Sequence, residues 1–164
     1  MKAIPLVASV LATVLVACSP NHRAPRDEVE RRVLDSRSLR QLAIAGDGRF
    51  TQAALVRNCL APTAVVAPPC RAVRGAERPV AASTSGRRAL RIITGAQAAT
   101  VSVLAGPPIT DSVDFTEATP VDHDRRRRWR VRLGKAPAAG DTIVIRIAPL
   151  RTDGGSAEFL VQVG

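Results

Sequence analysis

The stretch from Arg125 to Leu133, RRRRWRVRL, carries the side chains of this sequence that are best suited to binding an anion. A guanidinium group is permanently charged, and its fork of N–H donors matches the paired oxygens of a carboxylate or a phosphate. In a strand, alternate side chains point to opposite faces. The arginines expected on one face are Arg128, Arg130 and Arg132. The apolar residues expected on the opposite, core-facing side are Trp129, Val131 and Leu133.

A second alternating stretch begins at Thr142, and we expect it to form the neighbouring strand. Its core side would carry Ile143, Ile145 and Ile147, and its other side would carry Val144 and Arg146. The candidate anion-binding residues are therefore Arg128, Arg130, Arg132 and Arg146. An alternative stays open, in which these arginines are only the solvated face of half-buried strands.

The N-terminal segment, MKAIPLVASVLATVLVAC, has the composition of a secretory signal. Lys2 supplies a positive start, and the apolar run from Ala3 to Leu15 is shorter than the roughly 20 residues needed to span a bilayer. The run ends in Leu15-Val16-Ala17-Cys18, which resembles the lipobox of bacterial lipoproteins. The resemblance covers residues 1–18, and no family is identified for the rest of the chain.

This resemblance implies that residues 1–17 are a signal peptide, that cleavage falls between Ala17 and Cys18, and that Cys18 carries acyl chains. Two or more acyl chains hold a protein stably on a membrane. Ser19 follows the cysteine, where lipoproteins retained at the inner membrane commonly have Asp. We therefore expect a lipid-anchored protein of the cell envelope, on the outer membrane and facing the periplasm.

The net charge of +10 favours anionic partners, but this compartment contains little nucleic acid. Nucleic-acid binding also usually needs aromatic side chains on which bases stack, and Trp129 is expected to face the core. The expected partners are the membrane, through the N-terminal lipid, and an acidic envelope protein or an anionic envelope polymer. Nucleic acid is not an expected partner, and the expected role is non-enzymatic binding or scaffolding.

Cys59 and Cys70 are the two thiols that remain once Cys18 is lipidated. An even number of thiols in an oxidising compartment favours a disulfide. No histidine or further cysteine pair lies near them in the sequence, so a tetrahedral zinc site is not expected. A disulfide between them would stabilise the fold by about 3 kcal/mol, because it closes a short loop.

His123 lies between Asp122 and Asp124, and this group could contact a cation or position an imidazole. Adjacent residues in a turn point in different directions, however, and a metal site needs a third ligand with supporting hydrogen bonds. The sequence has no Gly-x-Ser-x-Gly or Ser-x-x-Lys motif. We therefore expect no catalytic residue, metal ion or cofactor. The alternative function is a small periplasmic enzyme or metal-handling protein that uses these three residues.

The mature chain is expected to have four parts: a tether (18–26), a helical segment with the disulfide loop (27–75), a linker (76–87) and a sheet domain (88–164). The pattern over 27–46 is helical, with a slip near Asp35 that fits one helix or two. Residues 50–58 fit either a short helix or a strand.

From residue 88 onward the apolar residues recur with period two. The six strands expected there are 89–94, 100–105, 113–118, 127–134, 142–150 and 158–163. Glycine and proline turns separate them. The sequence thus predicts a mainly β fold, a small antiparallel Ig-like β-sandwich of about six strands preceded by a short helical segment and a disulfide loop.

Overall fold

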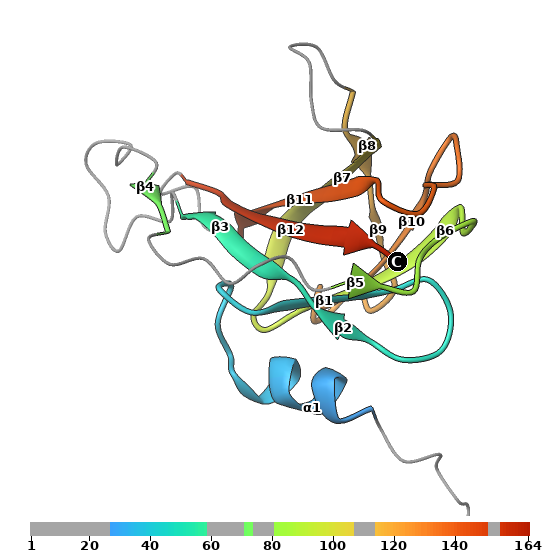
Figure 1. Cartoon of the computed structure of the whole chain (residues 1–164). Coiled ribbons are helices and arrows are strands. Elements are labelled where there is room, and N and C mark those ends of the chain that lie inside the picture. The colour runs from blue at the N-terminus through green and yellow to red at the C-terminus, as the bar shows by residue number, and fades with distance from the viewer. Residues whose placement is uncertain (1–26, 59–70, 74–80, 107–113, 151–154) are drawn as a thin grey trace, which may run out of the picture.

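A computed structural model describes residues 27–58, 71–73, 81–106, 114–150 and 155–164 (Figure 1). This part of the chain contains one helix and twelve strands, and the strands form two sheets. The mainly β sandwich expected from the sequence is thereby confirmed. The expected signal peptide (1–17), the expected lipidation site Cys18, the expected tether and the cysteines Cys59 and Cys70 lie outside the described residues.

Sheet A has five strands in the order β2-β1-β6-β10-β9, and all neighbouring pairs are antiparallel. Its strands are β1 (Leu42–Ala45), β2 (Thr51–Gln52), β6 (Ala89–Thr94), β9 (Thr119–Pro120) and β10 (Arg128–Arg132). Both edge strands are only two residues long. Short edges present little unpaired backbone to another chain, which limits edge-to-edge aggregation.

Sheet B has the order β4-β3-β12-β11-β7-β8, and β5 pairs with β12 in parallel. Its strands are β3 (Ala54–Asn58), β4 (Arg71–Ala72), β5 (Ala81–Ala82), β7 (Ala98–Gly106), β8 (Thr116–Glu117), β11 (Thr142–Pro149) and β12 (Ala157–Val163). The last strand of the chain, β12, therefore pairs with three others.

The main core lies between the two sheets and is mostly aliphatic. Its two large aromatic side chains are Trp129 from sheet A and Phe159 from sheet B, both buried. The side chains expected to face the core do so. They are Trp129, Val131, Leu133, Ile143, Ile145 and Ile147.

Helix α1 (Glu28–Asp35) packs on the outer face of sheet A, below β1 in Figure 1. Its N-cap, Asp27, accepts a hydrogen bond from the Val29 N–H at 2.9 Å and another from the Phe50 N–H at 2.7 Å. This carboxylate therefore both starts the helix and joins it to the sheet. The helix buries a second apolar cluster against the sheet, made of Val29, Val33, Ala43, Ala45, Phe50 and Ile93.

The helical pattern expected over 27–46 ends at Asp35, and Leu42–Ala45 form strand β1 instead. All four β1 residues are buried, since Leu42 and Ile44 face the main core while Ala43 and Ala45 face α1. A strand that is buried on both faces shows no polar–apolar alternation. Its run LAIA is therefore indistinguishable from part of a helix by periodicity.

Strands also begin well before residue 88, which corrects the expected division of the chain. Strands β1 to β4 come from the segment expected to be a helix and a disulfide loop, and β5 comes from the expected linker. Residues 88–164 do not complete the sandwich alone, because β1 pairs with β6 and β3 pairs with β12. Several strands have only two residues, too few to show a period, so twelve strands appear where about six were expected.

Of the strand expected over 113–118, the described residues form only β8, at Thr116–Glu117, and β9 follows directly in the other sheet. Strand β8 pairs with β7 in sheet B, and β9 pairs with β10 in sheet A. Ala118 lies between them and packs against the main core. The chain thus changes sheets at this residue.

Candidate anion-binding site

Strand β10 carries an arginine row, which we define as Arg128, Arg130 and Arg132. The expected alternation is confirmed, since Trp129 and Val131 are buried while Arg130 and Arg132 are exposed. Residues on one face of a strand are about 6.6 Å apart, two residue steps of 3.3 Å. The row therefore runs along the outer face of sheet A, between β6 and β9.

Arg91 on β6 lies directly opposite Arg130, so it joins the row on the same face. Its guanidinium donates a hydrogen bond to the Gly48 carbonyl at 2.7 Å and lies 5.1 Å from the centre of the Phe50 ring. Both partners are uncharged, so the positive charge of Arg91 is not neutralised. Like charges directly opposite each other in an antiparallel pair repel.

Arg128 differs from the other members of the row because two carboxylates flank it. Its guanidinium lies 2.9 Å from Glu30 on α1 and 3.9 Å from Asp122. Its side chain is 34% exposed. Arg128 therefore holds the helix against β10, and its charge is compensated.

Arg130 and Arg132 are the uncompensated members of the row. Within the ranges that the structure describes, neither side chain has a hydrogen-bond or ion-pair partner. Together with Arg91, they place three guanidiniums without a carboxylate on the outer face of sheet A. This group of three is the arginine face.

Arg146 lies elsewhere, which corrects the expected set of four. Strands β10 and β11 belong to different sheets, and both direct their apolar side chains into the core between them. Arg146 therefore points outward from sheet B, on the opposite side of the sandwich. It lies 2.8 Å from Glu158 and 4.4 Å from the centre of the Phe115 ring. Glu158 also pairs with Arg57, at 3.5 Å. Arg146 thus has a carboxylate partner on the other sheet, and it is not part of the arginine face.

Asp122 organises the turn that leads into β10. Its Oδ1 accepts hydrogen bonds from the backbone N–H groups of Arg127 and Arg128, both at 3.0 Å. His123 and Asp124 are exposed. Among the described residues, no group of three or more histidine, cysteine and acidic side chains is placed to hold a metal ion. Of the two carboxylates considered as possible ligands, Asp122 is thus engaged by the backbone through Oδ1, and Asp124 is exposed.

Arg127 is fixed between the end of α1 and the end of β6. Its guanidinium donates hydrogen bonds to the carbonyl groups of Leu34, Thr94 and Gly95. All three acceptors are neutral, so none of its hydrogen bonds is to a carboxylate. Burial lowers the pKa of Arg127, and the nearby Arg128, Arg37 and Arg125 lower it further, against an opposing effect of Asp122. An arginine remains charged at neutral pH even so.

Four arginines line a cavity of about 500 Å³ at the start of β10, which we call the arginine pocket. Its lining residues are Leu34, Asp35, Arg37, Asp122, Arg125, Arg127 and Arg128. Sequence reasoning missed Arg37, Arg125 and Arg127 as site residues. Arg125 and Arg127 were visible in the run RRRRWRVRL, but Arg37 is brought to the pocket only by the fold.

The backbone around the pocket has two unusual positions. Arg37 and Arg126 are the residues other than glycine with positive φ in the described ranges, at 50° and 45°. Such conformations cost energy for a residue with a Cβ, and they often occur at functional sites. Gly95 lets the loop after α1 approach, because a Cβ there would meet the Ser38 carbonyl and the Ser36 hydroxyl. Glycine at 95 thus helps to bring Arg37 close to Arg127.

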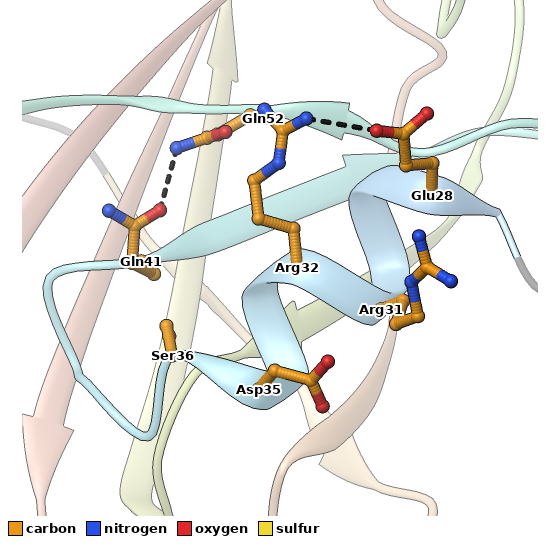
Figure 2. Close-up of a pocket in the computed structure, with 7 residues that line it drawn as sticks. All are labelled: Glu28, Arg31, Arg32, Asp35, Ser36, Gln41 and Gln52. Atoms are coloured by element: carbon orange, nitrogen blue, oxygen red, sulfur yellow. Dashed lines mark hydrogen bonds and ion pairs between the residues drawn. The ribbon is translucent and has the colours of Figure 1, made fainter.

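A second cavity, of about 750 Å³, shares Asp35 with the arginine pocket (Figure 2). Its other lining residues are Glu28, Arg31, Arg32, Ser36, Gln41 and Gln52. Figure 2 shows Arg32 bound to Glu28, at 3.1 Å, and Gln52 bound to Gln41, at 2.6 Å. Two arginines are balanced here by two carboxylates. This second cavity therefore has no marked preference for an anion.

The fold and the site define a β-sandwich with an arginine-rich outer face and an adjoining arginine pocket. No protein-family model matches the chain, and no curated protein or solved structure matches it. Among the residues that the structure describes, no helix has the length and apolar character needed to cross a membrane.

Proposed function

We propose that the protein is a lipid-anchored lipoprotein of the bacterial envelope that binds an anionic partner through its arginine face. It acts as a non-enzymatic binding or scaffolding module. The observation that carries the binding role is the grouping of Arg91, Arg130 and Arg132 on one outer face with no carboxylate partner among the described residues. The lipobox Leu15-Val16-Ala17-Cys18 supports the anchor.

The chain between the proposed lipid and the sandwich is short. Residues 18–26 separate the proposed lipid from the start of the described chain, and nine residues span at most about 30 Å. The sandwich would therefore stay close to the membrane that carries it. With Ser19 after the cysteine, we place it on the outer membrane, facing the periplasm. The partner would be an acidic envelope protein or an anionic envelope polymer.

The anchor is tested by the intact mass and the membrane partitioning of the full chain expressed in a bacterium, beside Cys18→Ala. The expected product begins at Cys18, is heavier by its acyl chains and stays in the membrane fraction. Cys18→Ala is expected to keep residues 1–17 and to gain no acyl mass. An unmodified, uncleaved wild-type chain would refute the lipoprotein assignment.

The binding face is tested by retention of the detergent-solubilised full-length protein on immobilised polyglutamate and polyphosphate. Arg130→Glu with Arg132→Glu is expected to lower the salt concentration needed for elution. The matched control is Arg31→Glu with Arg40→Glu, which makes the same change in net charge at two other exposed positions. Equal losses in the two double variants would show that retention depends on net charge, and the arginine face would be rejected.

A further inference from the structure

We propose that the arginine pocket binds a phosphate group. This inference deepens the proposed function by naming a ligand class for one end of the arginine row. The pocket adjoins the row through Arg128, which lines the cavity and begins β10. It does not depend on the lipid anchor.

Charge is the first argument for a phosphate group. The lining carries four arginines and two carboxylates, those of Asp35 and Asp122. Glu30 lies outside the lining but 2.9 Å from Arg128, so the whole group keeps an excess of one positive charge. A phosphate group carries a charge of about −1.5 to −2 at pH 7 and three strong acceptor oxygens. It would therefore neutralise this excess and also supply acceptors for the guanidinium donors.

The available donors are the second argument. Arg127 is held by three backbone carbonyls, so it contributes a fixed charge. The guanidiniums of Arg37 and Arg125 have no hydrogen-bond or ion-pair partner within the part of the chain that is described, so their donors are available. They come from the loop after α1 and from the turn before β10. A tetrahedral phosphate presents three acceptor oxygens in different directions, so it can accept from both arginines at once even though they approach from different segments.

The third argument is that the guanidiniums are held together at a cost. Arg127 lies close enough to Arg128, Arg37 and Arg125 for their charges to disfavour its own, and Arg37 adopts a backbone conformation that favours glycine. A doubly negative ligand would relieve this repulsion. A cavity of about 500 Å³ also has room for a phosphate together with the group that it esterifies.

The test is a titration of the full-length protein in detergent with inorganic phosphate, beside acetate at the same ionic strength. Trp129 is the single tryptophan of the chain, and the Arg126 guanidinium lies 5.6 Å from the centre of its ring. Its fluorescence therefore reports on the turn that carries the pocket arginines. Phosphate is expected to give a saturable change, and acetate is expected to give none at the same concentrations.

Three variants decide whether the pocket is responsible. Arg125→Ala and Arg37→Gly are each expected to weaken phosphate binding about tenfold or more, since each removes a charged donor. Arg37→Gly suits its positive φ, so it keeps the fold intact. Arg40→Ala, an exposed arginine outside the pocket, is expected to bind as the wild type does. No saturable phosphate binding, or equal weakening in all three variants, would overturn the proposal.

Two further experiments identify the source of the phosphate group and test the pocket independently of the arginine face. Competition by soluble glycerol phosphate would indicate a free phosphate ester, and tighter binding to micelles that contain phosphatidic acid would indicate a lipid headgroup. Arg130→Glu with Arg132→Glu is expected to leave the phosphate titration unchanged. Lower polyanion retention with an unchanged phosphate titration in this double variant would support both sites. Unchanged retention with intact phosphate binding would reject the arginine face alone, and normal retention without phosphate binding in the wild type would reject the pocket alone.

Discussion

Arg91 and Arg130 lie directly opposite each other on neighbouring antiparallel strands, β6 and β10, on the outer face of sheet A. Two like charges in this position repel, and cross-strand pairs contribute roughly 0.2–1 kcal/mol. Sheet A keeps this pair without a carboxylate beside it among the described residues. The arginine face is therefore maintained at some cost to the stability of the sheet.

Arg130→Glu is expected to raise the free energy of unfolding by up to about 1 kcal/mol, because it replaces repulsion of Arg91 by attraction. The measurement is chemical denaturation at low salt, where surface charges are least screened. Arg132→Glu is the matched control, since it lies opposite Ala89. Equal effects of the two variants would mean that the Arg91–Arg130 pair has no particular role.

Arg37→Gly is expected to stabilise the fold by about 1 kcal/mol, since a left-handed backbone conformation costs a residue with a Cβ roughly 1–2 kcal/mol. Arg126→Gly, at the other such position, is expected to gain less. Arg126 also donates a hydrogen bond to the Ala99 carbonyl and stacks over Trp129. Thermal unfolding compares the two variants, and a destabilised Arg37→Gly would contradict the strain at this residue.

Asp122→Ala is expected to destabilise the protein by about 2–3 kcal/mol, because two backbone N–H groups lose a charged acceptor. Asp122→Asn keeps an oxygen acceptor and is expected to cost about half as much. His123→Ala and Asp124→Ala, at exposed positions, should stay within about 0.5 kcal/mol of the wild type. The comparison uses denaturant midpoints. A large loss in His123→Ala would show that the imidazole also stabilises this turn.

A disulfide between Cys59 and Cys70 is expected from the strands that flank them. Asn58 on β3 and Arg71 on β4 are direct partners in an antiparallel pair, and each is adjacent in sequence to one cysteine. We predict an intact mass lower by two hydrogens and a loss of about 3 kcal/mol on reduction. Cys59→Ser with Cys70→Ser should show the same loss without reductant. Free thiols in the protein purified without reductant would contradict this prediction.

In the sheet that carries the arginine row, the sequence predicts those strands that have one solvent-exposed face and one buried face. Trp129 and Val131 alternate with arginines, so the period of two in β10 is visible in the sequence. Strand β6 was predicted with its observed limits for a similar reason. Strand β1 was missed because α1 covers its outer face, and no polar residue marks that face.

The grouping of the site residues was less predictable than the strands. Arg130 and Arg146 both point outward, as expected, but the order of strands places them in different sheets. Periodicity assigns a residue to one side of its own strand and carries no information on which strands are neighbours. Arg37 could not be assigned to the pocket for the same reason, since it lies 88 positions before Arg125 in the chain.

The position of β12 has a consequence for the order of folding during synthesis. This strand comprises Ala157–Val163 of a 164-residue chain, yet it pairs with β11, β3 and β5. Strands β11 and β3 both pair with β12, so the middle of sheet B stays open until residues 157–163 have been synthesised. All five strands of sheet A lie before residue 133, so sheet A can pair before sheet B is complete.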